Sequence, residues 1–450
     1  MYSFVGRTLI DVSRCCALVL LALAGAAVSL QGQTRGLDSL FLTSDEAVDR
    51  ALSGNPELLR ERVRIARARA ELSRAPFFPE RPELEAALSS DAPFRNEGEG
   101  EWELFVSQEF EIGGQYFLRR SVAEATVVQT EYEIKAVELA LRADTRTAYA
   151  RLVAAESRLR LLDTLRAFAG RLDTLAAQLL AAQEISELDR NLVRIERAQA
   201  EMERSTAASD LFAARVELGR LTGTGTGIVI AAPPESLRPP SRGTIDSIAR
   251  IVAAVEADSA LFLSQRPDWQ ALESARRRAG LERDLANRVW LPRVKLGVGV
   301  LSETTAETGP GDATVLSSDR FLGLTLGIGI PLPFSGLYDL GEADRAVADA
   351  EVLAIDAEQR IIRSRIRADI DGALGRLELA LAAYTTYVRE IEPLVARNIE
   401  LLERGYAGGE LSAVEVVTQQ ERLLRAADGL IEARLAYEIA LADVERATAR

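Results

Sequence analysis

A long segment of the chain, from Gln115 to about Ala182, contains no proline. Its apolar residues recur three and four positions apart: Leu165, Phe168, Leu172, Leu175 and Leu179. A later segment shows the same alternation: Leu377, Leu381, Tyr384, Val388, Ile391, Val395, Asn398 and Leu402. This spacing is typical of helices that pack as coiled coils. At 1.5 Å per residue a helix over 116–182 would be about 100 Å long, against a mean helix of about 11–12 residues. We therefore predict long helices that span a distance, rather than helices that enclose a compact core.

The chain also repeats itself. Glu184-Ile185-Ser186 returns as Glu410-Leu411-Ser412, and Leu188-Asp189 returns as Val414-Glu415. Three further matches occur in the same order along the two halves: Asn55-Pro56-Glu57-Leu58 with Arg266-Pro267-Asp268-Trp269, Pro82-Glu83-Leu84-Glu85 with Pro292-Arg293-Val294-Lys295, and Phe110-Glu111-Ile112-Gly113-Gly114 with Leu332-Pro333-Phe334-Ser335-Gly336. Each match is weak alone, but their shared order indicates an internal duplication.

The duplication suggests a division of the chain into four parts: a signal peptide at 1–29, a first repeat at 30–222, a Gly-, Thr- and Pro-rich linker at 223–244, and a second repeat at 245–450. Each repeat is predicted to contain one or two helices, a pair of strands and a long helical hairpin. The predicted strands of the first repeat lie near 82–90 and 102–112. The second repeat is predicted to open with helices near 245–262 and 268–289.

The first repeat shows how its helices are expected to pack. Thr43 or Ser44 caps a helix predicted over 45–75, with Glu46 placed for a capping box. Another helix is predicted over 186–222. The combined length of these two helices matches that of the long helix, so we expect them to lie end to end beside it.

The composition excludes several classes of protein. The chain has no histidine, which removes His-based catalytic triads and His-ligated metal sites. It has 54 basic and 68 acidic residues and a net charge of −14, which argues against nucleic-acid binding. Its many acidic residues form no recognisable catalytic motif. We therefore expect no enzyme activity, no cofactor, no metal site and no nucleic-acid partner.

The N-terminus has the pattern of an export signal. Arg7 and Arg14 precede an apolar run from Cys15 to Val28, and Ala27-Val28-Ser29 is an acceptable cleavage site. The alternative is a buried or amphipathic N-terminal helix. Cleavage would remove both cysteines of the chain, Cys15 and Cys16, so the mature protein would have no disulfide and no thiol ligand. Neither cysteine lies in a lipidation motif.

The predicted strands have one apolar face. In one strand Val294, Leu296, Val298 and Val300 alternate with polar or small residues, and in another Leu322, Leu324, Leu326, Ile328 and Ile330 do so. The strand at Trp102, Leu104 and Val106 follows the same rule, although Gln108 interrupts it. This pattern fits a sheet with lipid on one side and water on the other, or a sheet that covers a soluble core. The export signal and the long helices favour lipid. Four strands do not close a barrel, whereas three copies would supply twelve.

At this point the chain resembles the TolC family of outer-membrane efflux proteins, over nearly all of its mature length. The resemblance rests on Leu42-Thr43-Ser44-Asp45-Glu46-Ala47-Val48 followed by Asn55-Pro56-Glu57-Leu58, on the strand-to-helix joints at Gly113-Gly114 and Pro331-Leu332, and on Tyr406-Ala407-Gly408-Gly409-Glu410-Leu411-Ser412. It implies an α+β, mainly α fold: a homotrimer with a twelve-stranded β-barrel in the outer membrane of a Gram-negative bacterium and an α-helical barrel in the periplasm.

The resemblance also implies a function and partners. A member of this family is a passive conduit that meets a periplasmic adaptor protein and an inner-membrane pump, here expected to be of the RND type. The segment Gln108-Glu109-Phe110-Glu111-Ile112-Gly113-Gly114-Gln115 resembles the cation-efflux branch, as does Pro82-Glu83-Leu84. The cargo is therefore expected to be heavy-metal cations or drugs. A type I secretion duct of the same fold is the first alternative. A periplasmic coiled-coil adaptor is the second, although adaptors have one hairpin rather than a duplicated set.

The turns of the two helical hairpins are implied to form the periplasmic tip, which carries the adaptor contact and the gate. Matching positions are Glu184, Ser186, Tyr406, Gly408, Gly409, Leu411 and Ser412. The glycines are expected to permit a tight turn, or merely to end a helix. The first repeat has Ala182-Gln183 in their place.

Two further sets of residues are implied by the resemblance. Glu415 matches the first acid of a pore constriction, with Asp189 as its equivalent in the first repeat, while Thr418 stands where a second acid would be. Three copies of Glu415 would attract cations; the alternative is a solvated charge. Tyr406 matches a tyrosine that holds the closed tip by a hydrogen bond, or is a surface aromatic.

A bend is expected in each long helix above the tip. Pro393 lies inside the second long helix, where proline costs about 3 kcal/mol in regular geometry, so we expect a kink. Gly170 lies close to its position in the first repeat and suggests a second bend.

Overall fold

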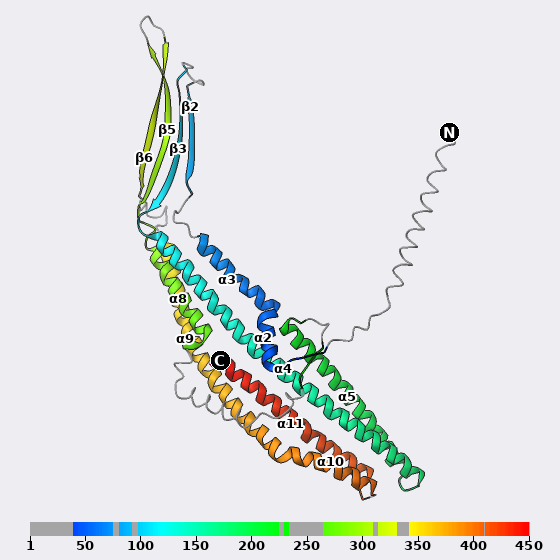
Figure 1. The fold of residues 1–450 in the computed structure, drawn as a ribbon. Coiled ribbons are helices and arrows are strands. Elements are labelled where there is room, and N and C mark those ends of the chain that lie inside the picture. Colours follow the sequence, from blue (N-terminus) through cyan, green and yellow to red (C-terminus); the bar gives the residue numbers. More distant parts are fainter. Residues whose placement is uncertain are drawn as a thin grey trace, which may run out of the picture.

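The structure is a computed structural model that describes residues 39–74, 81–91, 98–224, 229–233, 264–308, 314–330, 342–408 and 410–449. The predicted signal peptide, most of the predicted linker and the helix predicted near 245–262 lie outside these residues, as does Gly409. A sheet lies at one end of the molecule, and helices run from it to two turns at the opposite end (Figure 1). Within the described residues no helix is both long enough and apolar enough to cross a membrane.

The first repeat is built around one helix. α4 runs from Gln115 to Ala181, over 67 residues, which corresponds to about 100 Å. The helices α2 (Ser44–Gly54), α3 (Pro56–Arg74) and α5 (Glu187–Thr222) pack along it. The capping box of α2 is present as predicted, because Thr43 N–H donates to Glu46 Oε2 at 2.8 Å and Thr43 Oγ1 accepts from Glu46 N–H at 3.3 Å.

The helix predicted over 45–75 is in fact two helices, so that prediction was wrong. Asn55 has extended backbone angles between α2 and α3, as expected of a residue that precedes a proline. Its side chain uses the break: Asn55 Nδ2 donates to Leu221 O at 2.9 Å, and Leu58 N–H donates to Asn55 Oδ1 at 2.9 Å. The end of α5 thus meets the joint between α2 and α3. The predicted end-to-end arrangement beside the long helix is confirmed.

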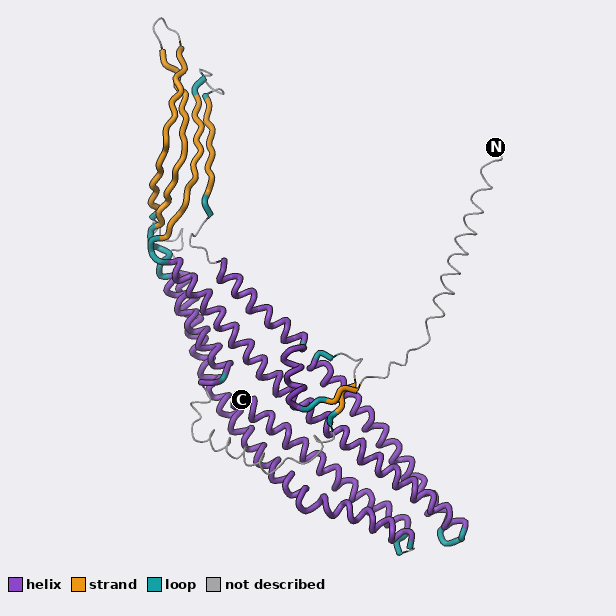
Figure 2. The backbone as a smooth tube through the Cα atoms, in the orientation of Figure 1, coloured by secondary structure: helices purple, strands orange, loops and turns teal. Residues whose placement is uncertain are grey.

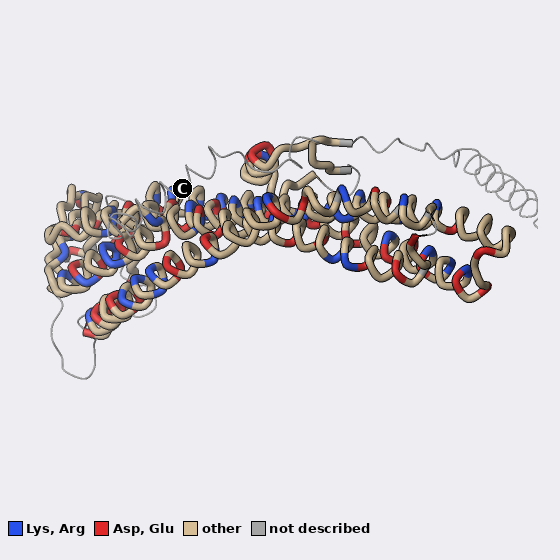
Figure 3. Tube along the Cα trace, turned by 90° about the horizontal axis from the view of Figure 1, so that it is seen from below, with Lys and Arg blue, Asp and Glu red and all other residues tan. Residues whose placement is uncertain are grey.

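The segment predicted as the second repeat also contains long helices, with more interruptions. It comprises α8 (Pro267–Ala286), α9 (Glu342–Thr386), a π-helical turn (Tyr387–Ile391), α10 (Glu392–Ala407) and α11 (Ala413–Thr448). α8 packs against α4 and α9, and α11 packs against α4, α9 and α10. The helices form one bent layer along which acidic and basic residues are distributed (Figure 3).

The sheet combines strands from both repeats. Its order is β2 (Glu83–Ser90), β3 (Gly100–Glu111), β5 (Arg293–Thr308) and β6 (Thr314–Gly329), and each neighbouring pair is antiparallel. The strands leave the helical layer together at one end (Figure 2). A separate parallel pair, β1 (Ser39–Phe41) with β4 (Val229–Ala231), lies beside the middle of α4.

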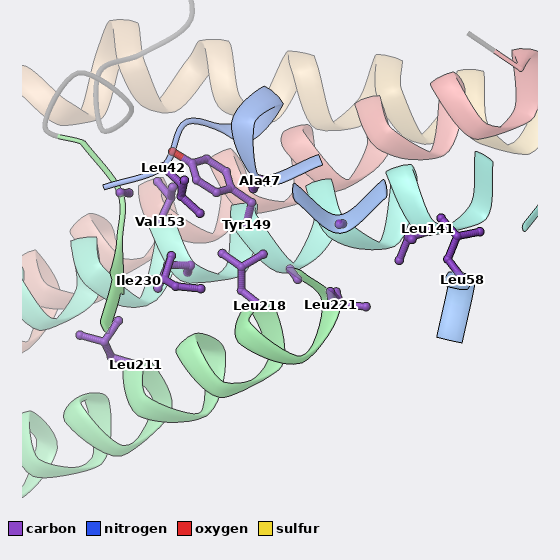
Figure 4. Close-up of a cluster of buried hydrophobic side chains, with 14 of the residues drawn as sticks. Leu42, Ala47, Leu58, Leu141, Tyr149, Val153, Leu211, Leu218, Leu221 and Ile230 are labelled. Atoms are coloured by element: carbon purple, nitrogen blue, oxygen red, sulfur yellow. The ribbon is translucent and has the colours of Figure 1, made fainter. Parts of the chain in front are cut away.

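The apolar cores lie between helices. One core joins β1, β4 and α2 to α4 and the end of α5, with Leu152 and Leu218 fully buried (Figure 4). A second joins α9 to α11 around the stacked rings of Tyr384 and Tyr437. A third lies near the two turns and joins the hairpins to each other. The cores thus fix the helices side by side along most of their length.

Candidate functional site: the paired hairpin turns and the apolar sheet face

The two hairpin turns have the same backbone design. In the first, the N–H of Glu184 donates to Leu179 O at 2.9 Å, and in the second the N–H of Glu410 donates to Gly405 O at 2.9 Å. These bonds close each preceding helix with the six-residue loop of a Schellman motif. The sequence match between Glu184-Ile185-Ser186 and Glu410-Leu411-Ser412 therefore reflects a shared turn.

The glycines of the second turn differ in what they do. Gly408 has φ −81°, so it does not need the left-handed freedom of glycine, contrary to the expectation for this residue. Gln183 in the first turn does adopt that conformation, with φ 60°, and its counterpart Gly409 lies outside the described residues. Gly405 has a packing role that sequence reasoning missed, because a Cβ there would lie 2.8 Å from Leu411 Cδ1.

Both predicted constriction acids belong to capping boxes. Glu415 Oε2 accepts from Ser412 N–H at 2.8 Å and from Ser412 Oγ at 2.9 Å, while Glu415 N–H donates back to Ser412 Oγ at 3.3 Å. Asp189 and Ser186 form the same arrangement at the start of α5. The Ser-x-x-acid spacing was visible in the sequence, and it gives each carboxylate a structural task in addition to its predicted one.

The charge of Glu415 is well supported. Hydrogen bonds from the Ser412 backbone and hydroxyl lower the pKa of this exposed carboxyl below its ordinary value. The N-terminus of α11 also favours a negative charge at this position. Both hydrogen bonds end on Oε2. Glu415 is therefore an ionised group held in a fixed place at the end of the molecule.

Tyr406 is buried between the hairpins and is not a surface aromatic. Only 2% of it is exposed, and its ring lies in the core formed by Phe168, Leu172 and Val193 of the first hairpin with Val416 of the second. Its hydroxyl makes no hydrogen bond within the described part of the chain. Burial, followed by the nearby charge of Asp189, raises the pKa of Tyr406. A buried hydroxyl without a hydrogen-bond partner is costly.

Glu196 is a half-buried polar group between the hairpins. Its Oε1 accepts from Gln420 Nε2 at 3.0 Å, which joins α5 to α11. Burial raises the pKa of Glu196, and the neighbouring Glu421 and Glu203 raise it further. Sequence reasoning missed this contact because nothing in the local pattern indicates which faces of the two helices meet.

Asp173 joins the two helices of the first hairpin, α4 and α5. Its carboxylate accepts hydrogen bonds from Arg190 and, at 2.8 Å, from Arg197, and so joins α4 to α5. Burial opposes its ionisation, but the hydrogen bonds from Arg197 and Arg190 outweigh it and lower the pKa of Asp173. Sequence reasoning missed this cluster too, because the three residues come together only when the hairpin closes.

Pro393 directly follows the change of helix type in the second hairpin. The π-helical turn spans Tyr387–Ile391, and the N–H of Glu392 donates to Tyr387 O, five residues earlier. A proline offers no N–H for a regular helical bond, and π turns are a common cause of kinks. In the first hairpin α4 continues through Gly170 without a change of helix type.

The sheet presents an exposed apolar face. The register places Leu104 beside Val300 and Val300 beside Leu322, and Leu84, Val106, Val298 and Leu324 form the next row. Leu88, Leu322 and Leu324 are each more than 70% exposed. The opposite face is mainly polar or small, although Phe105, Leu301 and Phe321 also lie on it, and there Lys295 Nζ lies 2.5 Å from Glu85 Oε1. An apolar face of this kind marks a surface that meets lipid or another protein.

The described residues contain no group of three or more His, Cys, Asp or Glu side chains that could hold a metal ion. The chemistry available at the turns is therefore that of fixed charges, capped helix ends and one unpartnered hydroxyl.

Comparison with known proteins places this geometry in a known fold. No family model matches the sequence. The chain is 23% identical over 318 residues to the cobalt-zinc-cadmium resistance protein CzcC of Cupriavidus metallidurans, which covers 70% of this chain and 69% of that protein. It superposes on the crystal structure of CusC with a TM-score of 0.70 at 16% identity, over 93% of this chain and 95% of CusC. The outer membrane protein VceC of Vibrio cholerae gives a TM-score of 0.67 at 15% identity, over 90% and 95%.

These similarities confirm the resemblance drawn from the sequence. The architecture of long helical hairpins with a four-stranded antiparallel sheet at one end is a TolC-like fold. The solved structures that share it are channel proteins rather than enzymes.

Proposed function

We propose that this chain, which has the fold of the TolC-family outer-membrane channels, is the outer-membrane subunit of a tripartite efflux system. The observation that supports this proposal most directly is the exposed apolar sheet face at one end of a helical layer about 100 Å long. The sheet would lie in the outer membrane of a Gram-negative bacterium, and the helices would extend into the periplasm. A strand of about 9–11 residues crosses a bilayer, and β3, β5 and β6 are long enough.

The assembly is proposed to be a homotrimer. Four strands with two open edges do not enclose a pore, and three copies would supply a closed twelve-stranded barrel. The hairpins would then form a ring with the turns at its periplasmic end. Glu184, Ser186, Leu411 and Ser412 lie at those turns, and we propose that they meet a periplasmic adaptor protein, with an inner-membrane pump of the RND type beyond it.

The proposed cargo is heavy-metal cations. The similarity to a cobalt-zinc-cadmium resistance protein supports this choice over drugs or proteins, because it covers about two thirds of both chains. The protein would catalyse nothing and would conduct passively. A duct of this kind needs no metal ligands of its own, since fixed negative charge is enough to favour cations.

The gate is proposed to lie at the turns. Three copies of Glu415 and three of Asp189 would place six carboxylates near the pore axis. Their capping hydrogen bonds fix these carboxylates in place, so the same residues would both cap a helix and supply charge to the pore. The buried ring of Tyr406 would help to hold the two hairpins together in the closed state, and the π turn before Pro393 would let the second hairpin bend as it opens.

The test separates the capping role of Glu415 from its charge. Glutamine also serves at the N3 position of a capping box, so Glu415→Gln keeps the cap and removes the charge, whereas Glu415→Ala removes both. Single-channel conductance would be measured in planar bilayers, with trivalent cations added on the periplasmic side. We expect block by these cations to weaken at least several-fold in both variants.

Three outcomes distinguish the claims. Small cation-selective currents that lose their block in both variants support the pore and the ring. Currents in which Glu415→Gln behaves as wild type and only Glu415→Ala differs would limit Glu415 to capping. Folded protein that never inserts into the bilayer would overturn the channel and favour a periplasmic adaptor.

A further inference from the structure

One charged side chain lies on the apolar face of the sheet. The register shows that this face carries the even-numbered residues of β2, β3, β5 and β6. Among the charged residues of these four strands only Arg320 is even-numbered, and all the others, such as Glu103 and Lys295, lie on the opposite face. A lone charge on such a surface calls for a reason, since a charged group is costly where it meets hydrocarbon.

The protein offers no acidic partner to Arg320. The residue is exposed, and it forms no ion pair with any residue that the structure describes. Asp319 and Glu303 are close to it in the register, but they lie on the opposite face. Closure of the proposed barrel would bring β2 of a neighbouring copy beside β6. The residues that β2 places on the apolar face are uncharged: Leu84, Ala86, Leu88 and Ser90.

Arg320 lies where the apolar face ends. Toward the helices, the rows of β5 and β6 contain only Val, Leu and Ile on this face: Val300 with Leu322, Val298 with Leu324, Leu296 with Leu326 and Val294 with Ile328. Toward the strand tips the rows are mainly polar or small: Thr304 with Ser318, Ala306 with Leu316 and Thr308 with Thr314. The arginine therefore marks the boundary between the two parts of the face.

The length of the apolar part fits one membrane. From Arg320 to Ile330, beside the helices, the ten residues of the strand advance about 34 Å. A strand tilt of about 35–45° would reduce this to about 25 Å of height, which is the height of the apolar band of a membrane barrel. The strand tips point away from the helices (Figure 2). In the proposed orientation Arg320 would thus lie at the headgroups of the outer leaflet, where an arginine costs little.

Trp102 stands in the same row of the sheet as Arg320. The register places Ser302 between them, with Trp102 on β3 and Arg320 on β6. Ser302 is small and only 4% exposed, whereas Trp102 is 42% exposed. Two strand spacings, about 10 Å, separate the backbones of Trp102 and Arg320. The row thus offers an indole and a guanidinium on either side of a small buried residue, at the level where tryptophan is typical of membrane proteins.

We infer that Trp102, Ser302 and Arg320 form a binding site for a phosphorylated glycolipid of the outer leaflet. This inference rests on the proposed function for the orientation of the sheet. A planar guanidinium binds a phosphate group through two parallel hydrogen bonds. The indole of Trp102 offers a flat apolar surface to a sugar ring and an N–H donor to its hydroxyls. The lipid would supply the anion that the protein does not provide for Arg320.

Native mass spectrometry of the purified trimer in mild detergent tests this site, because it identifies each bound lipid by its mass. The probes would be bisphosphorylated lipid A, the same glycolipid without its phosphates, and phosphatidylglycerol. We expect wild type to bind one lipid A per copy and Arg320→Gln to bind it at least about tenfold more weakly, since a charge-assisted contact is lost. Arg293→Gln is the matched control, because Arg293 is an exposed arginine on the opposite face of the same sheet, and it should bind as wild type does.

Several results would overturn the site. They are equal affinity of wild type and Arg320→Gln for lipid A, an equal loss in Arg320→Gln and Arg293→Gln, and equal binding of the glycolipid without phosphates. Phosphatidylglycerol that bound as tightly as lipid A would overturn the choice of a glycolipid. Conductance in planar bilayers would show that Arg320→Gln still forms pores, so a loss of binding would not reflect misfolding. Wild-type protein that formed neither trimers nor pores would instead overturn the proposed function.

Discussion

The two hairpin turns share one backbone conformation, but the helices of each hairpin are held together by different contacts. Both end with the same helix-closing bond and begin the next helix with the same capping box. In the first hairpin Asp173 is bound by Arg190 and Arg197. At the same offset that relates the turns, the second hairpin has Ile399, Val416 and Leu423.

The difference teaches which constraints the two hairpins share and which they do not. A turn must satisfy the backbone groups at the ends of two helices, so its geometry is shared. The contact between the two helices of a hairpin can be made in more than one way, and the two hairpins differ in it. The first hairpin uses directional ion pairs, whereas the second uses apolar packing next to a π turn. We expect the first to be the more rigid of the two.

Removal of the Asp173 charge should have the largest effect. In Asp173→Asn the two arginines lose their carboxylate, and we expect the first hairpin to lose about 2–3 kcal/mol, since a partner of a largely buried charge is removed. Hydrogen exchange of the α4 and α5 amides near the turn would measure it. Ile399→Ala is the matched change in the second hairpin and should leave the first unaffected.

The pH dependence of the same site follows from its lowered pKa. Because the pKa of Asp173 is lower in the folded chain, its contribution is present above the pKa of the unfolded chain. It is lost as the pH falls through the folded value. Protection of the first hairpin that did not fall on acidification, or that was equal in Asp173→Asn and wild type, would contradict the ion-pair account.

Two glycines offer a comparison of intermediate size with opposite signs. Gly170 lies inside α4 with no atom within 4 Å of a would-be Cβ, so Gly170→Ala should stabilise the first hairpin by about 0.5–1 kcal/mol. Gly405→Ala should instead lower the free energy of unfolding of the second hairpin by about 1–2 kcal/mol, because its Cβ would meet Leu411. Thermal unfolding of the two variants in parallel would show the contrast. Equal shifts in melting temperature would mean that Leu411 moves aside without cost.

The smallest expected effect concerns the left-handed residue of the first turn. Gln183→Gly places glycine where the backbone has φ 60°, and we expect a gain of at most about 1 kcal/mol. The gain is limited because glycine also makes the unfolded chain more flexible. Exchange of the Glu184 amide, which closes the turn, would report it. A loss of protection at this amide would show that the Gln183 side chain contributes something that its backbone angle does not reveal.

Much of the fold could be predicted because it depends on local patterns. The spacing of Leu165, Phe168 and Leu172 predicted the long helix to within one residue at its end. Period-two alternation at Val298 and Leu324 predicted strands whose apolar residues share one face. One error in the first repeat, the continuous helix over 45–75, came from underestimating how strongly Pro56 restricts Asn55.

The candidate site was less predictable for a physical reason. Ser412 and Glu415 lie within one helical turn, and their spacing is that of a capping box, although only the box at Thr43 and Glu46 was predicted. Glu196 and Gln420 touch only because two hairpins from different halves pack together, and no local period carries that information.

The sequence by itself therefore determined the helices, the strands and the shared turns, because each depends on residues a few positions apart. The tertiary structure alone decided which helix faces meet. It buried the hydroxyl of Tyr406 without a hydrogen-bond partner among the described residues, joined Asp173 to two arginines, and left Ile195 exposed. Such contacts depend on the packing of distant segments, where many sequences satisfy the same local pattern but only the assembled layer selects the neighbours.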